Sequence, residues 1–135
     1  MKIYYREKSG GIEILRCFGI EGRVEIPGMI DDKLVISAAP YAFSSHMDEK
    51  EELKNASLWE VSEGLGFGRE EHVLAGNDVE EIVFPYTLKE IGRYIFYGCG
   101  NLQKLELSDS LMQIGCGAFT GCHALEKLTV HMRQG

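Results

Sequence analysis

Apolar and polar residues alternate in short stretches of this chain, and the stretches recur at a fixed distance. Leu105 and Leu107 alternate with polar neighbours, which predicts a short strand of about 4 residues with one buried face. Residues 114–125 (IGCGAFTGCHAL) repeat residues 91–102 (IGRYIFYGCGNL) after a shift of 23 residues, with Ile, Gly, Phe, Gly, Cys and Leu at the same offsets. A period of this length is typical of stacked structural units.

The repeat extends beyond this window. A weaker copy lies over residues 24–43, with five extra residues in its loop. One such coil is too thin to bury its own apolar side, so we expect the coils to stack and share a core. Gly92 and Gly115 follow the apolar residues of each unit, where a positive φ would let the chain turn sharply, and Gly98 and Gly121 mark a second corner. The residues expected in the core are Ile82, Leu105, Leu128, Phe96 and Phe119.

The repeat pattern Leu-x2-Ile-Gly-x2-(Ile/Ala)-Phe-x-Gly-Cys-x2-Leu-x2-Leu-x-Leu resembles the BspA type of leucine-rich repeat. The resemblance covers residues 79–130 and, more weakly, residues 12–43, where GGIEILRCFG followed by VEIP is similar to the hairpin that opens such domains. It implies a mostly β solenoid with short parallel strands on one face. Known members occur in bacterial surface and gut-commensal proteins, where they serve in adhesion or protein binding, and no repeat position is catalytic.

An acidic insertion interrupts the repeats. Residues 44–81 contain eleven acidic residues and three Lys or Arg, a net charge of −8 that leaves +1 for the rest of the chain. Ser45 and Asp48 form a capping pair, so we expect a short helix within residues 47–56 and a glycine-rich loop after Trp59. We expect one domain over residues 1–135, made of an N-terminal cap and first coil (1–43), the insertion (44–78) and regular repeats (79–135).

Overall charge and targeting signals narrow the classes of partner. The formal net charge of −7 disfavours nucleic acid and anionic membrane as partners. The first residues, MKIYYREKSGG, contain no apolar signal region, and no apolar run reaches the ~18 residues that a membrane-spanning helix needs. We therefore expect a cytoplasmic protein whose four cysteines stay thiols.

Several residues invite a chemical interpretation, but their spacing favours a structural one. Cys99 and Cys122 share a repeat position and are expected to pack as buried thiols, whereas Cys116 and His123 fall on exposed turns. Cys116, Cys122 and His123 match no zinc spacing, and GLGFG (residues 64–68) lacks the third glycine of a phosphate loop. We expect no catalytic, cofactor or metal site.

The sequence therefore favours non-catalytic binding of a protein whose identity it does not reveal. The alternatives are a structural spacer within a longer protein, or an adhesin-like module if the natural protein is exported. The insertion offers two apolar anchors, Trp59 and Phe67, for a basic partner surface. The strand face offers two rows of outward side chains, Arg23, Glu81, Lys104 and Lys127 in one and Glu25, Val83, Glu106 and Thr129 in the next.

The last strand is expected to have a bare edge. Leu125, Leu128 and Val130 would pack on one side only, which invites pairing with another chain. We expect this edge to be covered, either by self-association as a homodimer through this C-terminal coil or, in a longer natural protein, by further residues.

Overall fold

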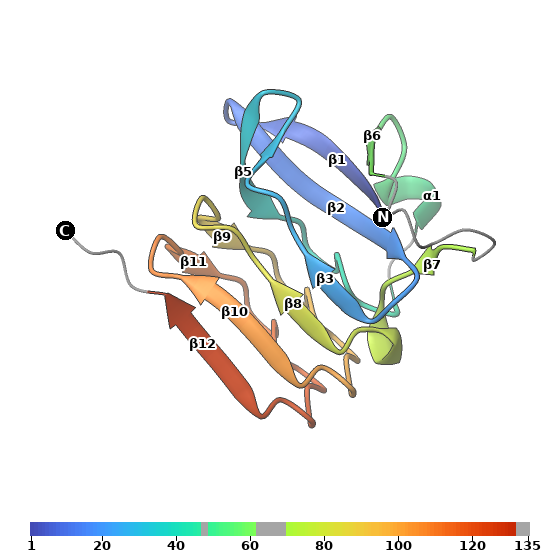
Figure 1. Cartoon of the computed structure of the whole chain (residues 1–135), viewed down its shortest axis with the longest axis vertical. Helices are drawn as coiled ribbons and strands as arrows, with labels where there is room; N and C mark the ends of the chain where they lie inside the picture. The colour runs from blue at the N-terminus through green and yellow to red at the C-terminus, as the bar shows by residue number, and fades with distance from the viewer. Residues whose placement is uncertain (47–48, 62–69, 132–135) are drawn as a thin grey trace.

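The computed structural model describes residues 1–46, 49–61 and 70–131 (Figure 1). Almost all of its regular structure is β, arranged in two sheets that form the sides of a stack of coils. The elements are β1 (Lys2–Lys8), β2 (Gly11–Gly19), β3 (Arg23–Glu25), β4 (Met29–Ile30), β5 (Lys33–Ala38), α1 (Glu49–Glu52), β6 (Ser57–Glu60), β7 (His72–Val73), the 3-10 helix η1 (Gly76–Asp78), β8 (Glu81–Val83), β9 (Glu90–Ile91), β10 (Lys104–Ser108), β11 (Gln113–Ile114) and β12 (Lys127–His131).

One side of the stack is a parallel sheet of four strands in the order β12-β10-β8-β3 (Figure 1). Its register pairs Leu105 with Ile82 on one neighbour and with Leu128 on the other, which are the residues related by the shift of 23. Val24 pairs with Ile82, so the weaker first copy also lies in register. The structure confirms the predicted solenoid of 23-residue repeats.

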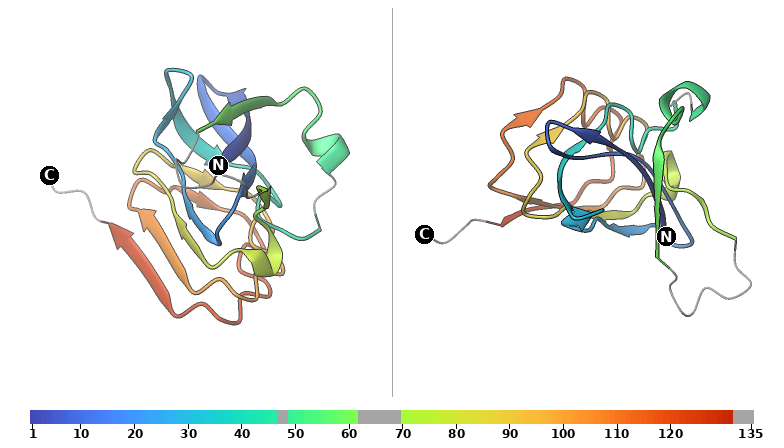
Figure 2. Two further views of the ribbon diagram at one scale, coloured as in Figure 1. Left: turned by 45° about the vertical axis from the view of Figure 1, so that its right-hand side comes forward. Right: turned by 90° about the horizontal axis from the view of Figure 1, so that it is seen from above.

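The other sheet joins the coils to an N-terminal hairpin. Its strand order is β11-β9-β5-β2-β1-β6, with β4 pairing β5 and β7 pairing β2 outside this path. β1 and β2 form the antiparallel hairpin expected at the start of the chain, and β2 continues into the coils through parallel pairing with β5. The hairpin therefore covers the first coil and supplies the cap that a solenoid end requires (Figure 2).

The core lies between the two sheets and is closed at one end by the hairpin. Ile82, Phe96 and Leu105 are fully buried, as expected. Two expectations were wrong. Leu128 is 52% exposed and Phe119 is only partly buried, because their coil is the last in the stack and receives neighbours from one side alone.

The glycines after each Ile have a different role from the one predicted. Gly98 and Gly121 do have positive φ, at 79° and 84°, but Gly92 and Gly115 do not. A Cβ added to Gly92 would lie 2.2 Å from the backbone nitrogen of Pro40 in the preceding coil. Gly92 is thus needed because two coil backbones approach closely, and not for a left-handed turn.

The insertion leaves and re-enters the stack at one point, since the Gly76 amide donates a 2.8 Å hydrogen bond to the Phe43 carbonyl. Its helix, α1, is only four residues long and lies outside the stacked coils (Figure 2). Two other described segments of the insertion form strands, since β6 pairs with β1 and β7 pairs with β2, both antiparallel. Residues 47–48 and 62–69, including Phe67 and GLGFG, lie outside the described residues.

The edge of β12 that faces away from β10 pairs with no strand among the described residues. Met112, Ile114, Leu128 and Val130 are all exposed on this last coil. We propose that two copies pair here: an antiparallel pair of β12 strands centred on Thr129 would place Leu128 opposite Val130 of the second copy.

Light scattering of this 135-residue chain is therefore expected to show a dimer that dissociates on dilution. A double variant, Leu128→Asp with Val130→Asp, should be monomeric at every concentration, because it removes the apolar pairs and adds like charges. A strict monomer in the wild type, with slow amide exchange at residues 125–130, would contradict the proposal.

Candidate protein-binding site

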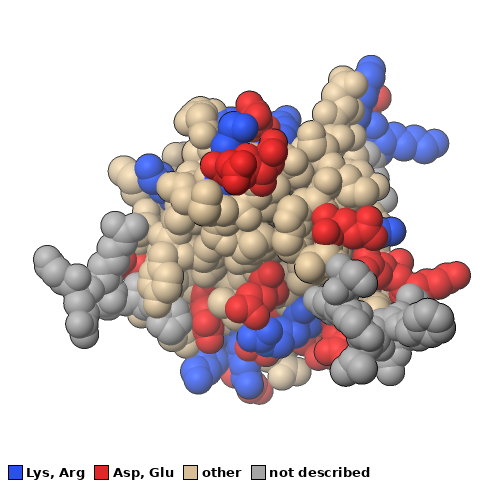
Figure 3. Space-filling view, turned by 45° about the horizontal axis from the view of Figure 1, so that its top comes forward, with Lys and Arg blue, Asp and Glu red and all other residues tan. Residues whose placement is uncertain are grey.

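The outward face of the parallel sheet carries the two predicted rows of side chains. The register aligns Arg23, Glu81, Lys104 and Lys127 across the four strands, and Glu25, Val83, Glu106 and Thr129 in the next row. The side chains therefore project at the regular strand spacing of about 4.8 Å. Acidic and basic side chains lie intermixed in the lower part of Figure 3.

The charges on this face differ between its two ends. Near the hairpin, Arg23 contacts Glu25 at 3.1 Å and Glu81 at 3.5 Å, and its hydrogen bond to Glu25 raises the pKa of the guanidinium. At the other end, Lys104 and Lys127 lie on neighbouring strands and are both exposed. Neither lysine forms an ion pair within the part of the chain that the structure describes.

Trp59 lies beside the hairpin end of the same face. It is partly buried, packs against the core and lines a hollow of ≈ 430 Å³ together with Glu25, Pro27, Val61 and Met1. A second hollow of ≈ 170 Å³ shares Glu25 and Met1 and is also lined by Arg23. The structure thus places Trp59 of the insertion near Glu25 and Arg23 of the strand face, two surfaces that the sequence analysis treated separately.

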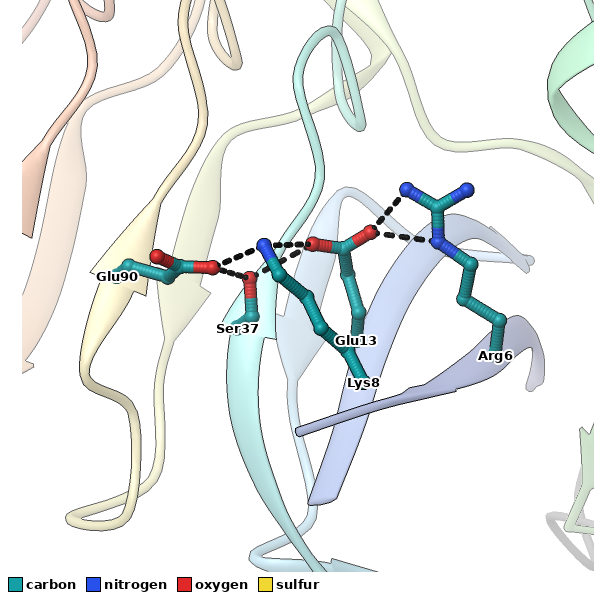
Figure 4. Close-up of polar contacts among 5 residues, drawn as sticks. All are labelled: Arg6, Lys8, Glu13, Ser37 and Glu90. Carbon is teal, nitrogen blue, oxygen red and sulfur yellow. Dashed lines mark hydrogen bonds and ion pairs between the residues drawn. The ribbon is translucent and has the colours of Figure 1, made fainter. Parts of the chain in front are cut away.

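A charged network that the sequence analysis missed links the hairpin to the coils (Figure 4). Glu13, on β2, is only 1% exposed and forms ion pairs with Arg6 at 2.6 Å and with Lys8 at 3.0 Å. Ser37, on β5, lies within hydrogen-bond distance of Glu13 (2.9 Å) and of Glu90 on β9 (2.8 Å). Lys8 also pairs with Glu90, which raises the pKa of the lysine and lowers that of the carboxyl.

This network borders a hollow of ≈ 250 Å³, yet its contacts favour a structural role. Each buried or half-buried carboxylate already has a cation, and because separating such a pair would leave an uncompensated buried charge, the pairs constrain the strands that hold them. The signal in the sequence was Glu13 itself, a charge within the otherwise apolar run GIEILRCFG. Arg16 in the same run is buried and donates to the carbonyls of Tyr41, Ala42 and Ser44, where the insertion begins.

Cys99, Cys116 and His123 lie where the repeat phase predicted, whereas Cys122, which was expected to be buried, is not fully so. Cys99 is buried and Cys122 half-buried, and each thiol contacts the carbonyl of a Phe in the preceding coil, Phe43 at 3.3 Å and Phe96 at 3.5 Å. Cys116 and His123 are exposed. Among the described residues, no group of three or more His, Cys, Asp and Glu side chains could hold a metal ion. No helix in the described ranges is long and apolar enough to cross a membrane.

Comparisons with known proteins point to the same architecture. A family model described as "BspA type Leucine rich repeat region (6 copies)" matches residues 70–133. A search of curated proteins found no match. A solved structure, the crystal structure of the T. pallidum leucine rich repeat protein, is similar over 92% of this chain with a TM-score of 0.66 and 24% identity. The chain spans 45% of the length of that structure.

Proposed function

Because residues 70–133 match the model of the BspA-type leucine-rich repeat, we propose that this chain is a repeat module that binds a protein partner without catalysing a reaction. Stacked repeats suit this role, since each coil adds one more strand to a continuous surface. The partner would lie across the outward face of β3, β8, β10 and β12.

The observation that carries the proposal is the regular arrangement of unlike charges on this face. Near the hairpin, Arg23 pairs with both Glu25 and Glu81 and leaves a net charge of −1, whereas Lys104 and Lys127 at the far end have no ion-pair partner among the described residues. Complementary charge chiefly sets the orientation and association rate of a complex. A partner with acidic groups opposite the lysine pair would therefore dock in one orientation.

Photo-cross-linking from position 129, in the second of the two rows, is the way to identify this partner. The photoreactive amino acid p-benzoylphenylalanine replaces Thr129 in one sample and the 83% exposed Met112, on the last coil but outside the strand face, in a control. The proposal requires an adduct with a different protein that forms only from position 129, because a cross-link to a second copy of this chain would report the β12 pair instead. The captured protein must then be purified for direct binding measurements.

The double variant Lys104→Gln with Lys127→Gln is expected to bind that purified partner about tenfold more weakly, because two exposed attractive charges are lost. Glutamine is chosen because a carboxylate at position 104 would lie opposite Glu81. Lys89→Gln, an exposed lysine outside the two rows, serves as the matched control. Equal affinities of all three proteins, measured by biolayer interferometry, would refute binding through the strand face.

A further inference from the structure

β6 is the outermost strand of the larger sheet and offers a backbone edge. Within the described ranges, β1 is the only strand that pairs with it. The Met1 amino group and the Val61 amide each donate a 3.0 Å hydrogen bond to the other residue's carbonyl. Because bonded and non-bonded pairs alternate in an antiparallel ladder, the backbone groups of Leu58 and Glu60 face away from β1. They are the groups that a further strand would use.

The side chains of β6 next to this edge line the larger hollow. Trp59 and Val61 share one face of the strand and line the ≈ 430 Å³ hollow with Glu25 and Pro27. A strand added beyond β6 would place one residue directly opposite Trp59, with its Cβ about 5 Å away. That residue would project on the Trp59 side and reach the hollow.

The chemistry around the hollow favours a cation at that position. Glu25 lines the hollow and is 65% exposed at its side chain, and because it shares the single charge of Arg23 with Glu81, these three residues together keep a net negative charge. Residues 44–81, which include β6, carry the net charge of −8 noted above. The face of an indole also attracts a Lys or Arg side chain. Backbone edge, aromatic face and carboxylate therefore converge on one kind of ligand.

We propose that β6 binds an extended segment of a protein by strand addition, with a Lys or Arg of that segment seated against Trp59 and beside Glu25. The inference rests on the proposed recognition function and adds a second contact to it. The pairing supplies affinity through Leu58 and Glu60, and the hollow supplies specificity.

Trp59 is the only tryptophan of the chain, so its fluorescence reports on this site alone. The probe is the capped peptide Val-Thr-Lys-Thr-Val, compared with a twin that has Glu in place of Lys and a twin whose amide nitrogens are methylated. The Lys peptide is expected to change the fluorescence saturably and to bind at least about tenfold more tightly than either twin.

Each other result removes a defined part of the proposal. Equal binding of the Glu twin would refute the cation site, and equal binding of the methylated twin would refute strand pairing. No binding of the Lys peptide would refute both. Amide exchange gives an independent readout: the peptide should slow exchange at Leu58 and Glu60. Protection of those two amides before any peptide is added would show that the edge is already covered and would overturn the proposal.

A charge variant tests the role of the carboxylate. Glu25→Gln should weaken the Lys peptide several-fold and leave the Glu twin no weaker, whereas Glu126→Gln, an exposed glutamate on the last coil, should change neither. An unchanged affinity of the Lys peptide for Glu25→Gln would remove Glu25 from the site.

Because Lys104 and Lys127 do not line the hollow, their double variant separates this inference from the strand-face function. If the peptide binds but the double variant binds the partner as tightly as the wild type does, only the strand-face function is refuted. If the double variant binds the partner more weakly but the peptide does not bind, only this inference is refuted.

Discussion

The Phe96→Ala substitution is expected to lower the free energy of unfolding by about 3–5 kcal/mol. Phe96 is fully buried, and its ring centroid lies 6.1 Å from that of Phe43, 6.2 Å from Phe84 and 5.6 Å from Phe119. Removing it would leave a cavity at the centre of an aromatic cluster contributed by three successive coils. Urea denaturation followed by circular dichroism measures the loss.

Phe119→Ala is the matched control because it makes the same chemical change at the equivalent position of the last coil. Phe119 is only partly buried, so its truncation should cost clearly less, about 1–2 kcal/mol. A cost for Phe119→Ala equal to that for Phe96→Ala would mean that the last coil is covered in solution.

The Gly92→Ala substitution is expected to destabilise the protein by about 3 kcal/mol, although it adds only one methyl group. The new Cβ would lie 2.2 Å from the Pro40 nitrogen and 2.6 Å from the Ala39 carbonyl carbon, and backbone atoms cannot move aside as a side-chain end can. The two coils would have to separate and stretch the 2.8 Å hydrogen bond from the Gly92 amide to the Ala38 carbonyl. The midpoint of thermal unfolding should fall accordingly.

Gly28→Ala provides the comparison. The nearest atom to a Cβ at Gly28 is the Pro85 Cβ at 3.7 Å, an ordinary contact, and its φ is not in the left-handed region. This variant should stay within about 0.5 kcal/mol of the wild type. If Gly92→Ala were as stable as Gly28→Ala, the coils would not be packed as closely as the structure places them.

The repeat could be predicted because matching residues of successive coils occupy one column. The shift of 23 relates Ile82 to Leu105 and Leu128, and these residues pair in the parallel sheet. The same reasoning failed for the burial of Leu128, because a column position is buried only if a coil follows it. It also gave the wrong reason for the glycine at position 92, because the close approach of the Gly92 and Pro40 backbones involves residues some fifty positions apart in the sequence.

The insertion was predicted less well, again for a physical reason. Residues 49–56 include only Leu53 and Ala56 as apolar positions, too few to pack a longer helix against the core, so α1 ends at Glu52. β6 was not predicted because its partner, β1, lies near the start of the chain, far from residues 57–60 in sequence. Nothing local to residues 57–60 specifies that pairing. The meeting of Trp59 with Glu25 follows from this pairing and could not be read from either segment alone.

The four thiols form a graded set of probes for local opening of the solenoid. Only the thiolate reacts, and burial raises the pKa of Cys17 and of Cys99 to about 12, the latter with a further contribution from Cys122, whose own pKa is also raised by burial. Exposed Cys116 therefore labels in the native state, and Cys122 labels when the last coil frays. Cys99 and Cys17 label only when the inner coils or the hairpin separate. The order in which an alkylating reagent modifies these residues thus records the sequence in which the stack comes apart, from its uncovered end toward its cap.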